Sequence, residues 1–254
     1  MDQTLFQYSL RMGDTTLILS HRLSEWTGHG PELEEDLAMT NVALDLLGQA
    51  RMWLTLAGEL EGASRDEDQL AYLRDAPQYR NYLLVERDNG HYGHTIARQF
   101  LFDAWHYLLL QGLCTSTNEH VAAIAEKSIK EVSYHARRSS DILVRLGDGT
   151  AESHARMQDA VNDAWRFCGE LFIDDDITLA LEGQGVVPAH ASLWQPWLNH
   201  VALTLAEATL TMPDPDAAVH PAHTGGVYGR HTEALGYLLA EMQHLQRSYP
   251  GASW

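Results

Sequence analysis

The sequence predicts an all-α protein built as a bundle of long helices. Apolar residues recur at spacings of three and four along most of the chain, sustained period-two alternation is absent, and no repeat or low-complexity tract breaks the pattern. A length of 254 residues still fits one continuous core. We therefore expect a single helical domain over residues 1–254.

The helical pattern starts close to the first residue and continues in segments separated by short turns. Long helices are predicted over residues 4–25, 32–60, 91–114, 119–146, 151–172, 190–211 and 231–248, with short helical pieces near 66–83 and 175–183. Gly147 and Gly149 follow one helix, and Thr150 with Ser153 can cap the next. Residues 213–230, which contain several prolines and glycines, are predicted to form a loop.

The helix predicted over residues 32–60 carries two neighbouring apolar stripes. The first consists of Leu33, Leu37, Leu44, Leu47 and Leu54, and the second of Met39, Val42, Leu46, Trp53, Leu56 and Leu60. These stripes leave only a narrow polar ridge of Asn41, Asp45 and Gly48. This pattern predicts a helix that is buried on most sides and central to the bundle.

Composition and charge argue against several classes of partner. The formal net charge of -18 repels nucleic acid and anionic lipid, because binding to either requires clustered Lys and Arg. The N-terminal residues do not resemble a signal peptide, and no apolar run is long enough to span a bilayer. Cys114 and Cys168 form no metal or redox motif. We expect a cytoplasmic protein.

A carboxylate di-metal site in a helix bundle needs two Glu and two Glu-x-x-His pairs. One literal match exists, Glu241-Met242-Gln243-His244 in the last predicted helix, with no second match to complete a pair. Looser pairs are Asp103 with His106 and Glu131 with His135. A solvated face is the simpler interpretation of the Glu241 pair, but an atypical metal site built from these residues stays open as an alternative.

Most of the fourteen histidines fall where solvated or capping roles are common. Those near predicted helix ends or in loops are His29, His91, His94, His120, His154, His190, His220 and His223. Nucleophile-elbow and phosphate-loop motifs are absent from the sequence. The glycines of Gly225-Gly226-Val227-Tyr228-Gly229 precede a helix beginning near His231 and could place an anion at its N-terminus, although a flexible connection is the simpler interpretation.

Longer sequence motifs extend over nearly the whole chain. They are Gly28-His29-Gly30-Pro31-Glu32-Leu33-Glu34-Glu35-Asp36-Leu37-Ala38, Asn41, Leu44-Asp45-Leu46-Leu47-Gly48-Gln49-Ala50-Arg51, Thr95-Ile96-Ala97-Arg98-Gln99, Asp103-Ala104-Trp105-His106, Lys130-Glu131, Tyr134-His135, His231-Thr232-Glu233, Leu239-Ala240-Glu241-Met242-Gln243, Pro250-Gly251 and Trp254. Together they resemble the C-subunit family of bacterial phenylacetyl-CoA epoxidases. The resemblance implies a ferritin-like long-helix bundle with additional helices, related to the bacterial multicomponent monooxygenases.

In that wider group a catalytic di-iron subunit pairs with a similar partner that has lost its metal, and the resemblance implies which role this chain has. The second bundle helix of the catalytic relative carries Asp-Glu-x-Gly-His, where this chain has Asp45-Leu46-Leu47-Gly48-Gln49. Leu46 thus replaces a carboxylate, and Gln49 replaces an imidazole.

A later helix of the catalytic relative carries Lys-Glu-Glu-x-x-His, which matches residues 130–135. Val132 replaces the ligand Glu there, while His135 remains. The first-helix ligand position falls on Leu23, and Asp103 keeps a carboxylate in the third helix. Two remaining ligands of six cannot hold a bridged di-iron centre, so the resemblance implies a chain without metal or other cofactor.

The same positions lie on inward stripes of their helices, so Leu23, Leu46 and Val132 should fill the former cavity. Asp103 and His135 should then meet, or share a buried polar network with Gln49, although Asp103 could instead bond His106 within its own helix. A buried carboxylate needs a partner in either case.

The function implied by the resemblance is that of a scaffold with no catalysis of its own. It would pair with the di-iron catalytic subunit and a small accessory subunit of an oxygen- and NADPH-dependent epoxidase in phenylacetate catabolism, and a homodimer of the isolated chain is compatible with it. Two alternative functions belong to other classes of protein. The first is a metalloenzyme using Asp103, His106, Glu131 and His135 with Glu241 and His244, and the second is a non-oxygenase interaction protein of the same fold. Bound metal or copurifying subunits would discriminate among them.

Overall fold

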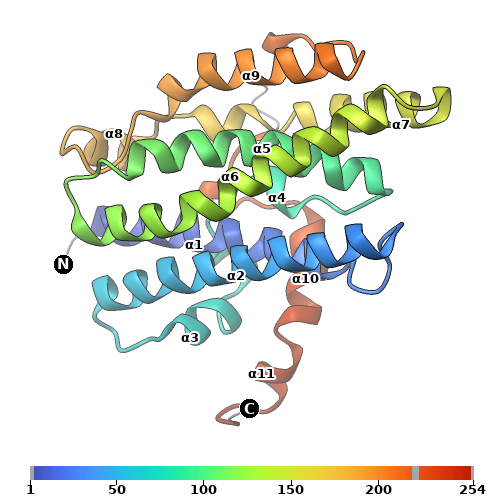
Figure 1. Cartoon of the computed structure of the whole chain (residues 1–254). Coiled ribbons are helices and arrows are strands. Elements are labelled where there is room, and N and C mark those ends of the chain that lie inside the picture. The colour runs from blue at the N-terminus through green and yellow to red at the C-terminus, as the bar shows by residue number, and fades with distance from the viewer. Residues whose placement is uncertain (1–2, 219–222, 253–254) are drawn as a thin grey trace. The chain divides into compact units, whose positions relative to one another are not determined.

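The computed structural model describes residues 3–218 and 223–252, and every regular element in these ranges is helical. The α-helices are α1 (Gln3–Ser24), α2 (Leu33–Glu61), α3 (Glu67–Tyr72), α4 (Leu83–Glu86), α5 (Tyr92–Leu113), α6 (Glu119–Gly147), α7 (Ala151–Trp165), α8 (Asp176–Glu182), α9 (Trp194–Glu207), α10 (Glu233–Met242) and α11 (His244–Ser248) (Figure 1). The predicted all-α class is therefore confirmed for the described residues.

Several predicted helices are shorter than expected. The helix predicted over 151–172 ends at Trp165, and a separate 3-10 turn follows over Gly169–Phe172. The segment 190–211 begins with a 3-10 turn and its helix ends at Glu207. The segment 66–83, where short helical pieces were predicted, holds α3 and a 3-10 turn with Pro77 at its start, a position where proline is tolerated. The predicted cap at Thr150 and Ser153 is present as a capping box.

The residue contacts divide the chain into two compact units. The first unit comprises Met1–Asp88 and Gly225–Trp254, and the second comprises Asn89–Thr224. Each unit contains one hairpin of long helices, α1 with α2 in the first and α5 with α6 in the second. Such hairpins are the building blocks of a ferritin-like bundle. The single-domain organisation of residues 1–254 stays a prediction.

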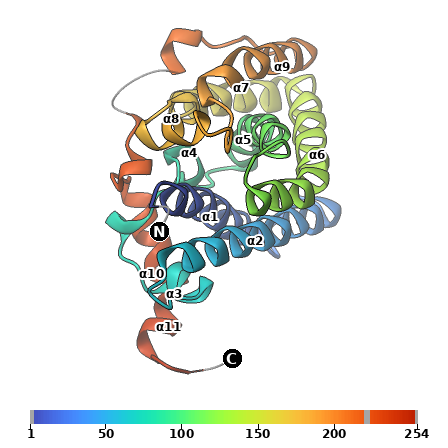
Figure 2. The same ribbon diagram turned by 90° about the vertical axis from the view of Figure 1, so that its left-hand side faces the viewer.

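In the first unit, α1 and α2 pack closely along their length, as Figures 1 and 2 both show. Gly13 makes the close approach possible, since a Cβ atom there would lie only 2.7 Å from Cδ2 of Leu54. Tyr8 meets Trp53 edge-on, with ring centroids 6.2 Å apart. The C-terminal helix α11 extends past α3 and away from this hairpin (Figure 2).

The outer face of α2 corrects a sequence-based expectation. The prediction that this helix is buried on most sides is wrong for its first apolar stripe, because Leu33 is 70%, Leu37 54%, Leu44 60% and Leu47 38% exposed. Only Leu54 of that stripe is buried. The second stripe is largely buried and supplies the contact with α1. Periodicity identified both stripes but could not show that only one has a partner within the chain.

In the second unit, α5 is covered by α6, α7 and α9. An aromatic cluster joins these helices to the segment that follows α7: Trp165 stacks on Trp197 at 5.2 Å, and Phe172 lies 5.0 Å from the same ring. The indole of Trp197 donates a hydrogen bond to the carbonyl of Leu101 (2.9 Å). The cluster therefore fixes α9 against α5.

No helix in the described ranges has the length and apolar character to cross a bilayer. Cys114 and Cys168 are free thiols, and burial raises the pKa of the Cys168 thiol, which keeps it protonated and unreactive.

Candidate functional site

The second unit buries polar side chains where α5 faces α6. Gln99, Asp103 and His106 follow one another at helical spacing on α5, and His135 and Ser139 lie on the facing side of α6. All five side chains are at most 2% exposed. This cluster contains Asp103 and His135, the two positions where the sequence retains metal-binding side chains.

Asp103 on α5 and His135 on α6 lie near enough for the charge of His135 to act on the carboxyl of Asp103, but no hydrogen bond joins these two side chains among the described residues, and Oδ2 of Asp103 is buried without a hydrogen-bond partner. The Oδ1 atom of Asp103 accepts a hydrogen bond from the side-chain amide of Gln99 (2.6 Å). Burial raises the pKa of Asp103 to about 6, an increase that the charge of His135 and the side chains of Ser139 and Gln99 reduce by favouring the ionised carboxylate. The neighbouring side chains thus offset part of the pKa increase that burial causes at Asp103.

His106, the expected alternative partner of Asp103 within α5, does not bond it. Neither ring nitrogen of His106 has a hydrogen-bond partner among the described residues. Burial, with a smaller contribution from the charge of His135, lowers the pKa of His106 to about 3. Its ring packs 5.1 Å from that of Phe102, so His106 serves as a neutral aromatic side chain in the core.

The other positions that the resemblance aligns with metal ligands are also in the interior. Val132 on α6 is fully buried in the second unit. Leu23 on α1 and Leu46 and Gln49 on α2 belong to the first unit, and each is at most 1% exposed. That Gln49 joins the network of Asp103 and His135 stays a prediction.

A di-iron centre does not fit these side chains. Leu23, Leu46 and Val132 have only hydrocarbon atoms and cannot coordinate a metal, so a single carboxylate and a single imidazole remain at the six positions. Across residues 3–218 and 223–252, no three His, Cys, Asp or Glu side chains are grouped so that they could hold a metal ion. No step involving a metal can therefore be assigned to these residues.

The literal Glu-x-x-His match is disrupted by the fold. The helix predicted over 231–248 is divided at Gln243, so Glu241 lies at the end of α10 and His244 starts α11. Both side chains are exposed. Gln243 is buried, and its amide donates to the carbonyl of Arg74 (2.9 Å) and to the hydroxyl of Tyr79 (2.8 Å). The residue inside the motif is thus structural, and its flanking residues face solvent.

The comparisons with known proteins agree with the resemblance carried by the motifs. The family model described as phenylacetic acid catabolic protein matches residues 1–254. The chain belongs to this family. It is also 50% identical over 250 residues to a protein of Escherichia coli (strain K12) named as the C subunit of 1,2-phenylacetyl-CoA epoxidase, and the match covers 98% of this chain and 99% of that protein.

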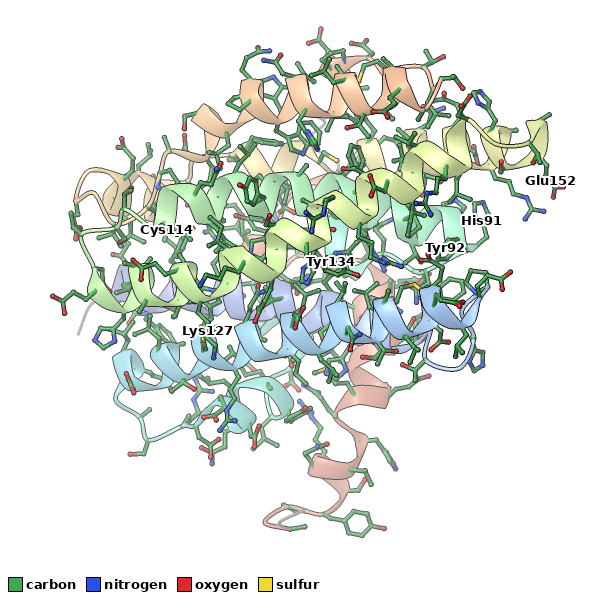
Figure 3. The ribbon with its side chains drawn as sticks, in the orientation of Figure 1. His91, Tyr92, Cys114, Lys127, Tyr134 and Glu152 are labelled. Carbon is green, nitrogen blue, oxygen red and sulfur yellow. The ribbon has the colours of Figure 1, made fainter. Side chains whose placement is uncertain are left out.

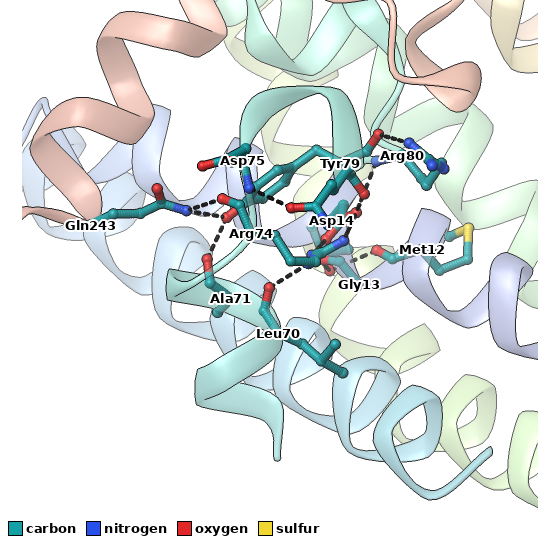
Figure 4. A network of polar contacts seen from close by, with 12 residues as sticks. Met12, Gly13, Asp14, Leu70, Ala71, Arg74, Asp75, Tyr79, Arg80 and Gln243 are labelled. Carbon is teal, nitrogen blue, oxygen red and sulfur yellow. Dashed lines mark hydrogen bonds and ion pairs between the residues drawn. The ribbon is translucent and has the colours of Figure 1, made fainter. Parts of the chain in front are cut away.

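This member of the family contains a buried ion pair that sequence reasoning missed. Asp14 on α1 and Arg74, after α3, are at most 3% exposed and form a bidentate ion pair (Figure 4). Asp14 also accepts from the backbone N–H of Arg80 (2.8 Å), and the guanidinium of Arg74 lies 4.4 Å from the ring centre of Tyr79. Together with Gln243, this network ties the C-terminal helices to α1 and α3.

A second buried carboxylate accounts for the helix start near His231. Glu86 is fully buried, and it accepts hydrogen bonds from the backbone N–H of Thr232 (2.6 Å) and from Nδ2 of Asn81 (3.0 Å). The ring of His231 lies 2.7 Å from the same carboxylate. The anion that sequence reasoning considered for this helix N-terminus is therefore an internal side chain.

Neither buried carboxylate had a local sequence signal, because Arg74 lies 60 residues from Asp14 and Thr232 lies 146 residues from Glu86. The histidine expectations are mostly consistent with exposure in the structure, since His29 and His120 are exposed and His154 is half-buried. His190 is an exception, being fully buried against Trp105. His220 lies outside the described residues.

At the other end of α5 from Cys114, His91 and Tyr92 lie near Glu152 of α7 (Figure 3). These residues line a small hollow of about 230 Å³ together with Arg156.

Proposed function

We propose that this chain is a non-catalytic subunit of a phenylacetyl-CoA epoxidase complex, in which it pairs with and stabilises a di-iron catalytic subunit. The observation that carries the proposal is the replacement of metal ligands by buried Leu23, Leu46 and Val132. Each contributes about 1.5–3 kcal/mol to the fold when fully buried, so the former cavity serves stability. The name of the Escherichia coli relative supplies the complex and its substrate.

The exposed stripe of α2 supports the pairing. Leu33, Leu37, Leu44 and Leu47 lie along one face of a 29-residue helix, which is unusual for a surface that meets only water. Gly48 lies beside this stripe, and a Cβ atom there would have no neighbour within 4 Å. A partner helix can therefore approach the backbone of α2 closely. We call these four leucines with Gly48 the α2 face.

The cluster around Asp103 has a structural role in this proposal. These side chains favour one register of α5 against α6, because a slip would move the carboxyl of Asp103 away from the charge of His135 and the side chain of Ser139, both of which favour its ionised form. The chain then requires no metal or cofactor of its own. Iron and substrate belong to the catalytic partner, the complex also includes a small accessory protein, and the whole assembly is cytoplasmic.

Metal analysis and complex formation test the proposal together. The isolated chain, reconstituted anaerobically with ferrous iron, should contain no stoichiometric iron after desalting. About two iron atoms per chain, with the absorption of an oxo-bridged pair, would establish the metalloenzyme alternative instead. Co-expression with the catalytic subunit of the same organism should give one complex in gel filtration at micromolar concentration.

The α2 face supplies the specific variant. Leu44→Glu with Leu47→Glu should abolish co-elution, because two charges would be buried without partners at the contact. Leu179→Glu with Leu203→Glu is the matched control, since these leucines are 52% and 73% exposed but lie on α8 and α9. Loss of the complex in both pairs, or in neither, would contradict docking through α2.

A further inference from the structure

The C-terminal part of the chain returns to the first unit through residues 225–232, which we call the C-terminal strap. The strap lies directly against the segment that precedes α4, since a Cβ atom on Gly226 would clash with the carbonyl oxygen of Asn81. It ends in His231 and Thr232, immediately before α10. The side chain of His231 is only 4% exposed. The strap thus buries a titratable ring at the point where it leads into α10.

Both ring nitrogens of His231 face hydrogen-bond acceptors. Nδ1 lies 2.7 Å from Oε2 of Glu86, and Nε2 lies 3.1 Å from the carbonyl oxygen of Tyr79. A neutral imidazole has one N–H and one lone pair, so it can donate to only one of these two oxygens. In either tautomer the lone pair of the other nitrogen would face an oxygen atom with no hydrogen between them. An imidazolium, by contrast, donates to both acceptors.

The carboxyl of Glu86 is the other group that could hold the second proton and donate it to Nδ1. Both of its oxygens already accept hydrogen bonds, Oε1 from the backbone N–H of Thr232 (2.6 Å) and Oε2 from Nδ2 of Asn81 (3.0 Å). Hydrogen bonds to the ionised form of a carboxyl favour that form. The second proton therefore belongs to the ring of His231, and the contact with Glu86 is an ion pair between buried groups.

Several other charged or titratable groups lie around this pair. They are Arg22 on α1, Tyr79 and Arg80 before α4, Arg87 and Asp88 after α4, and Arg230 and Glu233 on either side of the end of the strap. The guanidinium of Arg80 donates to the same carbonyl of Tyr79 (2.7 Å), and that of Arg22 donates to the backbone carbonyl of Glu86 (2.9 Å). Only the side chain of Glu86 forms an ion pair with the ring among the described residues, so this carboxylate is what holds the imidazolium.

We propose that His231 is a proton-dependent latch, which holds the C-terminal strap against the first unit as an imidazolium and releases it when the ring loses its second proton. Loss of that proton removes one of the two hydrogen bonds of the ring and leaves the charge of Glu86 buried without a counterion. The start of α10 keeps its bonds from Thr232 to Glu86 and from Arg22 to the carbonyl of Ala234 (3.0 Å), so release begins at the strap. The latch shares no residue with the α2 face and is independent of the proposed function.

The latch has one direction of pH dependence. A histidine in an unfolded chain loses its second proton around pH 6.5, so near pH 8 the unfolded chain binds fewer protons at this position than the folded chain with its latch closed. Stability falls with rising pH wherever the folded state binds more protons. The contribution of the latch is therefore fully present at low pH and is lost as the pH rises through the alkaline range.

Nitrogen-15 spectroscopy of the histidine rings tests the charge state in the whole chain. At pH 8 both ring nitrogens of His231 should give the resonance of a protonated nitrogen, whereas the exposed ring of His29 should be neutral. The imidazolium signal should be missing from His231→Gln. A wild-type spectrum without any imidazolium at this pH would overturn the proposal and needs no variant. A spectrum of His231→Gln that keeps every imidazolium signal of the wild type would overturn it as well.

Urea titrations across the alkaline range test the effect of the latch on the fold. The unfolding constant of His231→Gln divided by that of the wild type should fall by about tenfold between about pH 7.5 and pH 8.5, because only the wild type has this stabilising proton to lose. His29→Gln is the matched control, since it removes an exposed histidine, and its ratio should not change with pH. A ratio for His231→Gln that stays constant within about twofold would show that folding takes up no proton at His231 and would overturn the latch.

Discussion

The buried neighbours Asp103 and His135 give the sharpest test of the proposed structural role of these positions. Asp103 is fully buried and His135 is 1% exposed, so neither side chain can recover hydration when the other is removed. Asp103→Ala or His135→Ala should each lower the free energy of unfolding by about 1–3 kcal/mol, the usual cost of leaving a buried polar group without its polar neighbour. Asp103→Leu with His135→Leu should cost much less, because no unpaired polar group then remains in the core.

Urea titration followed by circular dichroism measures this effect. With a denaturant dependence of about 3 kcal/mol per molar, each single variant should shift the midpoint down by about 0.3–1 M. His106→Phe is the matched control, because His106 is buried on the same helix but has no hydrogen-bond partner among the described residues and stacks as an aromatic ring. It should unfold near the wild-type midpoint. Single variants of Asp103 and His135 that also unfold there would refute a structural role and reopen the question of a functional site.

Three further predictions follow from the same structure. Burial raises the pKa of Asp103 from 3.8 to about 6, so the stabilising protonated form is lost as the pH rises from about 4 to 6, and the wild-type free energy of unfolding falls by about 3 kcal/mol. Asp103→Asn should lack this fall in urea titrations at pH 4 and pH 7. An equal fall in both proteins would contradict the assignment. Arg74→Met should lower the free energy of unfolding by about 3–5 kcal/mol, because it leaves Asp14 buried without its partner. Adding Asp14→Leu should recover much of this loss in the same assay. Equal stability of the single and double variants would show that the ion pair is not the cause. Gly13→Ala should lower the free energy of unfolding by about 1–3 kcal/mol, because its Cβ would meet Leu54 at 2.7 Å. Gly48→Ala has open space around it and should leave the free energy of unfolding unchanged or raise it by about 0.5–1 kcal/mol through helix propensity. Unfolding temperatures that shift in the same direction in both variants would show that the contact with Leu54 is not limiting.

Local pattern in the sequence was enough to place most of the helices. The spacing of apolar residues predicted α1, α2, α5 and α6 to within about two residues at each end, because a 3.6-residue period over several turns is a strong signal. The ends of α7 and α10 were missed. At the first, the chain enters a 3-10 turn at Gly169, and at the second the helix breaks where Gln243 bonds Arg74, a residue 169 positions away.

For the candidate site, too, the sequence predicted some features and only the tertiary structure decided others. The residue types at Leu23, Leu46 and Val132 follow from the sequence, because a hydrocarbon side chain cannot bind iron whatever its surroundings. Which polar groups meet does not follow from it. Asp103 lies three residues from His106 on its own helix, yet the structure brings it to His135 on α6 and leaves His106 among aromatic rings.

Charge and amphipathic pattern in the sequence therefore determined the all-helical class and the apolar stripes of the long helices, because these depend on single residues and their neighbours within one or two turns. Tertiary structure alone decided which stripe of α2 remains exposed and which distant carboxylates are buried, such as Asp14 beside Arg74 and Glu86 beside His231. The physical reason is that burial and pairing depend on which residues the fold places beside each side chain. Residue spacing along the sequence does not specify those contacts when the partners are far apart in the chain.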